Sequence, residues 1–130
     1  MNRRFELVDV FGDGPLTGNP LAVVFDGDDL DSEQMQQIAR WINLSETTFL
    51  CSPTRTGADY RVRIFTPVRE LPFAGHPTLG TCHAWLTAGG GVQGSGEVIQ
   101  ECGRRAHPHS PYRCRTGVCR AAPDPLRSRR

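Results

Sequence analysis

The hydrophobic period of this chain changes repeatedly along its length, and these changes restrict the folds that it can adopt. A strand-like period holds over residues 5–25, where apolar β-formers flank a Gly/Pro/Asn stretch. The period becomes helical over residues 31–43 and returns to strand-like over residues 44–64, and a second helix is predicted from Pro77. This order favours an α+β fold in which a curled, mostly antiparallel sheet wraps around one central helix.

The two predicted helices differ in character. The first begins with a capping box formed by Asp31 and Gln34, carries apolar residues at i, i+3, i+4 and i+7 from Met35, and has a C-terminal stop at Asn43. The second continues to Gly89 with apolar and small residues on all sides. A helix without a charged face is typical of one enclosed by other elements.

Charge divides the chain into two parts. Its 130 residues correspond to one domain, with a net charge of +1. Residues 1–101 hold 7 Arg and 13 acidic residues, giving −6, whereas residues 102–130 hold 8 Arg and one acidic residue, giving +7.

The longest apolar run, Leu21 to Phe25, is far shorter than the about 20 residues of a membrane-spanning helix. Acidic residues also interrupt the segment where a signal peptide would have its apolar stretch. We therefore expect a cytoplasmic protein without a membrane partner.

The cysteines do not form a recognisable motif. Their number is odd and their spacings match neither a CxxC pair nor a zinc finger, so we expect neither a disulfide framework nor a metal site. We interpret all five as structural or incidental: Cys51, Cys82, Cys102, Cys114 and Cys119.

Two residues are candidates for chemistry. Glu46 lies between apolar residues at the start of a predicted strand, where a partly desolvated carboxylate is suited to moving protons near neutral pH. His76 follows Gly75 at the expected start of the second helix, where free backbone N–H groups favour a bound anion and an imidazole can relay a proton. Each also has a purely structural alternative, since Glu46 can cap a turn and His76 can cap the helix.

Four segments, in order along residues 5–103, carry a resemblance to a known family. They are VDVFGDGPLTGNPLAVVF (8–25), WINLSETTFL (41–50), YRVRIFTPVRELPFAGHPTLGT (60–81) and EVIQECG (97–103). Together they resemble the N-terminal half of phenazine biosynthesis PhzF-like proteins. Their order and spacing make this resemblance more specific than any one short motif.

The resemblance implies a diaminopimelate epimerase-like fold of two similar domains with the active site between them. It also implies a homodimer and a cofactor-independent isomerase that acts on a small carboxylate-bearing substrate, as in the isomerisation of trans-2,3-dihydro-3-hydroxyanthranilate. By resemblance, Glu46 of the NLSE motif shuttles the proton, and His76 of the GHPT motif binds and polarises the substrate. Ser45 and Gly75 then contribute to the wall of the pocket.

Two other interpretations stay open. Related epimerases use a cysteine pair as acid and base, and one of those cysteines stands where this chain has Ala74-Gly75-His76, so an amino-acid epimerase is the weaker enzymatic interpretation. The other is a non-catalytic half-domain that self-associates or pairs with another chain.

The resemblance ends at Gly103. We interpret residues 1–103 as an N-terminal PhzF-like domain and residues 104–130 as an aberrant, disordered Arg/Pro-rich tail. Apart from Tyr112 this tail lacks interleaved aromatic residues, so we expect no nucleic-acid partner. Translation of residues 104–122 one base later can restore a family-like run; we hypothesise a frameshift, which resequencing would reveal as one extra base near codon 103.

Family members also carry a second domain that supplies the rest of the pocket, and no segment of this sequence resembles it. We therefore expect the chain to be truncated and to have little or no activity alone.

Overall fold

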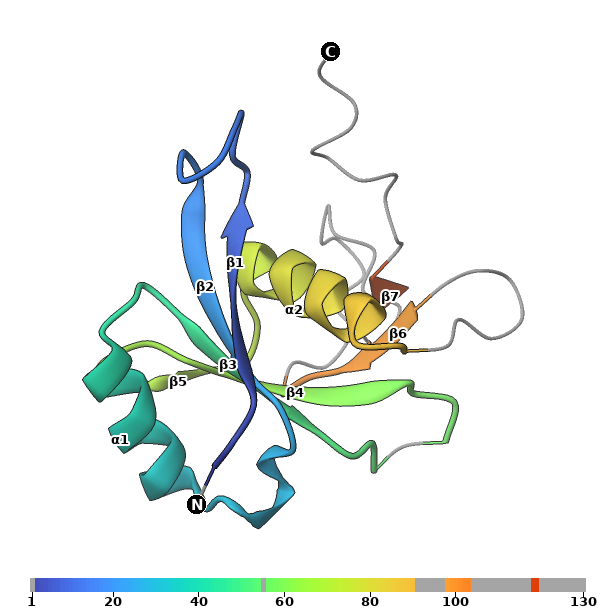
Figure 1. Ribbon diagram of the computed structural model, residues 1–130. Helices are drawn as coiled ribbons and strands as arrows, with labels where there is room; N and C mark the ends of the chain where they lie inside the picture. The colour runs from blue at the N-terminus through green and yellow to red at the C-terminus, as the bar shows by residue number, and fades with distance from the viewer. Residues whose placement is uncertain (1, 55, 91–97, 104–117, 120–130) are drawn as a thin grey trace.

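The strands that the structure describes form one mixed sheet with a helix on each face (Figure 1). The computed structural model describes residues 2–54, 56–90, 98–103 and 118–119. The strand order is β1-β2-β3-β4-β6-β7, and β5 pairs with β4 outside this path. In chain order the elements are β1 (Phe5–Val10), β2 (Asn19–Val24), the 3₁₀ turn η1 (Gly27–Asp29), α1 (Ser32–Ile42), β3 (Thr47–Cys51), β4 (Tyr60–Phe65), β5 (Glu70–Leu71), α2 (Gly75–Thr87), β6 (Val98–Glu101) and β7 (Val118–Cys119).

The sheet is mostly antiparallel, as predicted, but it contains two parallel pairs. These are β2 with β3 and β4 with β6, and the other four pairs are antiparallel. Parallel neighbours require a crossover connection. Here α1 lies in the connection between β2 and β3, and α2 lies in the connection between β4 and β6. The β2–β3 pair matters for the site, because it places the N-terminal ends of both strands at the same edge.

Alternation along the strands divides the core between the two faces. Val23 and Leu50 belong to the apolar cluster that contains Cys82 and Ala84 of α2. Their neighbours Val24 and Phe49 belong to a second cluster, which contains Met35 and Ala39 of α1. Because successive strand residues point to opposite faces, the two helices cover opposite sides of the sheet.

The sheet curls around α2, which confirms the predicted central helix. This helix contacts both β1 and β7, the two ends of the strand order, and Figure 1 shows it lying across the sheet between them. Close approach is possible because residue 80 is glycine. A Cβ atom at Gly80 would lie 2.5 Å from Leu21 Cδ2 and 2.9 Å from Val10 Cγ2.

The predicted start of the second helix at Pro77 is wrong by two residues. The helix α2 begins at Gly75 after an extended N-cap at Ala74 (φ −152°, ψ 141°). Proline is tolerated at the third position, because the first N–H groups of a helix have no intrahelical partner. This shift places His76 inside the first helical turn.

The first helix follows its prediction closely. The Asp31 side chain accepts a hydrogen bond from Gln34 N at 2.8 Å, and Asp31 N donates to Gln34 Oε1 at 3.0 Å, which completes the capping box. Asn43 closes the helix with a left-handed backbone (φ 59°). The following strand begins at Thr47 and not at Leu44, so Glu46 lies in the turn between α1 and β3.

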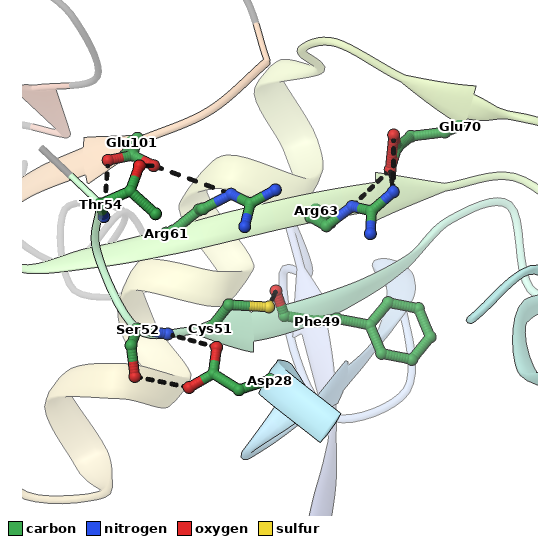
Figure 2. A network of polar contacts seen from close by, with 9 residues as sticks. All are labelled: Asp28, Phe49, Cys51, Ser52, Thr54, Arg61, Arg63, Glu70 and Glu101. Carbon is green, nitrogen blue, oxygen red and sulfur yellow. Dashed lines mark hydrogen bonds and ion pairs between the residues drawn. The ribbon is translucent and has the colours of Figure 1, made fainter. Parts of the chain in front are cut away.

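Two carboxylates fix the segment that follows β3 (Figure 2). Asp28 accepts hydrogen bonds from Ser52 N at 2.9 Å and from Ser52 Oγ at 2.5 Å. Glu101 likewise accepts from Thr54 N at 3.0 Å and from Thr54 Oγ1 at 2.7 Å. The hydrogen bonds from Ser52 hold the pKa of Asp28 below its ordinary value. This network stabilises a loop at the C-terminal end of β3 and accounts for these acidic residues without catalysis.

Most of the predicted tail lies outside the described residues. Within residues 104–130 the structure describes Val118–Cys119, which forms β7 antiparallel to β6. In the described part of the chain, no helix is both long enough and apolar enough to span a membrane.

Candidate active site

Glu46 lies at the N-terminal end of β3, on the side of the sheet that α2 covers. It directly precedes β3, and alternation places it on the same face as Thr48 and Leu50. Thr48 Oγ1 lies 2.7 Å from Thr81 Oγ1 of α2, so this face of the sheet points toward α2. The Glu46 side chain is only 20% exposed, so its carboxylate is largely withdrawn from water.

His76 bridges Glu46 and the first residue of β2. Its Nδ1 atom lies 3.0 Å from Glu46 Oε2, and its Nε2 atom lies 3.1 Å from the carbonyl oxygen of Asn19. The His76 side chain is 12% exposed. Three segments far apart in the sequence thus meet: the N-terminal ends of β2 and α2 and the turn before β3.

The Asn19 carbonyl determines which nitrogen of His76 carries a proton. A carbonyl oxygen only accepts, so Nε2 is the donor. The remaining nitrogen, Nδ1, then faces the Glu46 carboxylate. This nitrogen lies 3.0 Å from Glu46 Oε2, so any proton that Nδ1 carries lies directly beside the carboxylate.

The contact between Glu46 and His76 is close without being aligned as a hydrogen bond. Glu46 Oε2 is buried and has no partner of hydrogen-bond geometry among the described residues, although Nδ1 lies at ion-pair distance. Catalytic hydrogen bonds are often poorly aligned without substrate and tighten when it binds. A carboxylate oxygen in this state is available to a reacting group.

The other two predicted site residues flank this pair. Ser45 is exposed in the turn before β3, and Gly75 is the half-buried first residue of α2. The N-cap residue Ala74 has no side chain able to accept a hydrogen bond from the first turn of α2. The N–H groups at the start of this helix therefore favour an anionic group beside His76.

Two features of the site escape sequence reasoning. One is the Asn19 carbonyl, which belongs to the backbone and leaves no signal in the residue type. The other is Phe11, whose ring centroid lies 6.3 Å from that of His76. Phe11 is 60% exposed and adopts φ 62°, a conformation that bulky residues rarely adopt. A positive-φ aromatic residue directly after a strand has no strong sequence signature.

The described cysteines do not belong to this site. Cys51 and Cys82 are buried and Cys102 is partly buried. Burial raises the pKa of the Cys51 thiol, and a thiol of raised pKa is a poor base and nucleophile at neutral pH. In residues 2–54, 56–90 and 98–103, no three His, Cys, Asp or Glu side chains come together to hold a metal ion.

Comparison with known proteins identifies the relatives of this chain. The family described as phenazine biosynthesis-like protein (PhzC-PhzF) matches residues 8–116. A relative named antisense-enhancing sequence 1, from Schizosaccharomyces pombe, is 54% identical over 98 residues, which cover 75% of this chain and 33% of the relative. The trans-2,3-dihydro-3-hydroxyanthranilate isomerase of Pseudomonas aeruginosa is 59% identical over 81 residues, which cover 62% of this chain and 29% of that enzyme.

Solved structures agree with the sequence relatives. A predicted epimerase from Pseudomonas aeruginosa matches with a TM-score of 0.69 at 39% identity, over 80% of this chain and 36% of that chain. A hydroxyproline epimerase from Agrobacterium vitis has a TM-score of 0.55 at 16% identity, over 75% of this chain and 34% of its own length. The second comparison shows the fold alone.

The fold is therefore that of the PhzF and epimerase-like proteins, represented here by about a third of the length of such a chain. Within that class, the chain belongs to the phenazine biosynthesis-like protein family. Several of its relatives are named isomerases, so it belongs to an isomerase family. The chain spans about a third of the length of the curated relatives that it matches.

Proposed function

We propose that this chain carries the proton-transfer half of a PhzF-like isomerase. Glu46 removes a proton from a carbon of a small carboxylate-bearing substrate and returns it to a different carbon. His76 binds the substrate and polarises it. The observation that carries this proposal is the 3.0 Å contact between His76 Nδ1 and Glu46 Oε2, with Nε2 held by the Asn19 carbonyl.

The chemistry of such a step is balanced without another reagent. The Glu46 carboxylate becomes a carboxylic acid when it accepts the proton, and it returns to the carboxylate when the proton moves to the new carbon. The electron pair of the broken C–H bond shifts a double bond, so the substrate is neither oxidised nor reduced. Because the Asn19 carbonyl occupies Nε2, Nδ1 is the ring nitrogen through which His76 would donate a hydrogen bond to the negative charge developing on the substrate.

The surroundings of the pair support a carboxylate-bearing substrate. The N–H groups at the start of α2 and the helix dipole favour an anion there. Gly75 is the first residue of this helix, and Ser45 directly precedes Glu46 in the chain. We include both in the pocket wall. The amino-acid epimerase interpretation is weaker, since this chain has Ala74-Gly75-His76 where those enzymes carry one of their two cysteines.

The relatives named as trans-2,3-dihydro-3-hydroxyanthranilate isomerases support that compound as the first substrate to test. We further propose that the 130 residues alone turn over little or no substrate, because those enzymes are matched over 29% and 28% of their length. A cytoplasmic homodimer with a small-molecule substrate, acting without a cofactor, completes the proposal.

A chimera tests this function directly. The segment of the Pseudomonas aeruginosa isomerase that matches this chain is replaced by the corresponding residues of this chain, and isomerisation is followed with deuterium uptake from solvent. We expect turnover, and we expect Glu46→Gln to lower kcat by about 10²–10⁴-fold, the usual contribution of a general acid–base. Glu33→Gln is the matched control, since Glu33 is an exposed carboxylate in the first turn of α1. Full activity of the Glu46→Gln chimera would overturn the proposal.

The non-catalytic alternative also has an observation in its favour. Phe5 and Leu7 on the edge strand β1 are 55% and 65% exposed, and an exposed apolar edge invites pairing with another chain. Size-exclusion chromatography of the parent and of Glu46→Gln separates the two functions, because self-association does not depend on Glu46 whereas proton transfer does.

A further inference from the structure

A buried polar network ends at the first turn of α2, the turn that carries His76. Thr78 Oγ1 donates to the carbonyl oxygen of Ala74 at 2.8 Å and accepts from Gln100 Nε2 at 3.2 Å. Gln100 Oε1 in turn accepts from the hydroxyl group of Tyr60 at 3.0 Å. The side chains of the network are nearly inaccessible to water: Thr78 is 7%, Gln100 0% and Tyr60 3% exposed.

The network joins α2 to the sheet on the side away from Glu46. Tyr60 of β4 and Gln100 of β6 are partners in the parallel β4–β6 pair, whereas His76 contacts β2 and the turn before β3 through Asn19 and Glu46. The first turn of α2 is thus bonded to β6 and β4 on one side, and it contacts β2 and the turn before β3 on the other. Fully satisfied buried polar networks give a local structure a single arrangement, and His76 lies in the helical turn that this network holds.

A second threonine of α2 shows what a purely local bond looks like. Thr87 Oγ1 donates to the carbonyl oxygen of His83 at 2.9 Å, which is the same bond to the residue four positions earlier. Thr87 is exposed at the C-terminal end of the helix. Such bonds are common for threonine in helices and carry no further role. Thr78 differs because its hydroxyl group is also an acceptor for a buried amide of another element.

We infer that Thr78, held by Gln100 and Tyr60, is a positioning residue for His76. It fixes the first turn of α2 so that Nδ1 meets the Glu46 carboxylate while Nε2 meets the Asn19 carbonyl. This inference rests on the proposed function only for the catalytic meaning of the Glu46–His76 pair. The geometric effect is measurable on the chain itself.

The test uses the ¹⁵N-labelled 130-residue chain and the ring nitrogen chemical shifts of His76 at one fixed pH. These shifts report which nitrogen carries a proton. Glu46→Gln defines the shift that follows when the carboxylate is removed. We expect Thr78→Val, which keeps the side-chain shape but removes the hydroxyl group, to move the His76 shifts in the same direction and by a comparable amount. Thr78→Ser restores the hydroxyl group and is expected to return the parental shifts.

Thr81→Val is the matched control. It removes another buried hydroxyl bond of the same helix, the 2.7 Å contact with Thr48, but it does not touch the first turn, so the His76 shifts should stay parental. Should Thr78→Val fail to fold, Tyr60→Phe decides, since it removes only the far hydroxyl group of the network and should give a smaller shift in the same direction.

The outcomes separate this inference from the proposed function. Parental His76 shifts in Thr78→Val and Tyr60→Phe, with displaced shifts in Glu46→Gln, overturn the positioning role and leave the pair intact. Parental shifts in Glu46→Gln overturn the pair itself, and the proposed function and the positioning role fall together.

Discussion

The coupling between Glu46 and His76 can be measured as a free energy. At the observed 3.0 Å between Oε2 and Nδ1, two unit charges attract by about 5.5 kcal/mol at an effective dielectric constant of about 20. This is an upper limit, because the side chains are 20% and 12% exposed and water screens them. Fully exposed pairs are worth about 0–1 kcal/mol and breaking a buried pair costs about 3–5 kcal/mol. We therefore expect a coupling of about 1–3 kcal/mol in favour of the folded state.

A double-mutant cycle isolates this coupling. Glu46→Gln, His76→Asn and the double variant are unfolded with urea at neutral pH, and the free energies of unfolding are compared. The control cycle uses Arg4 and Glu6, whose 2.8 Å ion pair is 56% and 29% exposed, and it should give less than about 1 kcal/mol. If the effects at positions 46 and 76 add to within about 0.5 kcal/mol, as they do for independent sites, the two side chains do not interact and the reasoning about a coupled pair is refuted.

Three further predictions concern the packing of α2 against the sheet and two titrating groups outside the site. Gly80→Ala should lower the free energy of unfolding, because overpacking costs about 1–3 kcal/mol and exceeds the about 1 kcal/mol that alanine gains over glycine in a helix. Gly14→Ala, where a Cβ meets nothing within 4 Å, should leave urea unfolding unchanged, and equal midpoints for both variants would contradict the close approach of α2. The lowered pKa of Asp28 in the folded state means that its bonds to Ser52 stabilise the protein above the ordinary pKa of about 3.9 and lose this effect as the pH falls through the lower folded value. Asp28→Asn should therefore be less stable than the parent at pH 7, with a difference in urea unfolding that disappears in acid; a difference independent of pH would refute this. Because burial raises the pKa of Cys51, iodoacetamide should alkylate this thiol slowly in the folded chain and rapidly in urea, whereas equal rates would show that the thiol is open to solvent.

Local sequence signals predicted the local structure well. The capping box of Asp31 and Gln34 and the left-handed stop at Asn43 depend on side chains within one helix, so a single stretch of sequence contains all the information. The start of α2 was misplaced because proline at the first and at the third helical position satisfies the same constraint, a missing N–H group. The parallel pairing of β2 with β3 depends on how the connection through α1 returns to the sheet, which hydrophobic period does not encode.

The candidate site is predictable from the sequence only in part. The residue types of Glu46 and His76 suit proton transfer, which predicts both as site residues, and the structure brings them to 3.0 Å. Ser45 and Gly75 flank them, and their part in binding stays a prediction. The group that fixes the tautomer of His76 is the carbonyl of Asn19, and any residue at position 19 would offer the same atom. What selects it is the register of β2 against β3, a property of the assembled sheet.

In the chimera, proton transfer and substrate preference should depend on different parts of the protein. The Asn19 carbonyl, the Glu46 carboxylate and the His76 imidazole all come from this chain and are fixed by its own sheet and helix, so the transplanted segment should bring its proton-transfer pair with it. We expect the other wall of the pocket to come from the host enzyme. The chimera should therefore respond to Glu46→Gln while keeping the host's order of preference among substrates, measured as kcat/KM. A changed order of preference with the host segment unaltered would mean that the transplanted residues, Phe11 beside His76 foremost, also select the substrate.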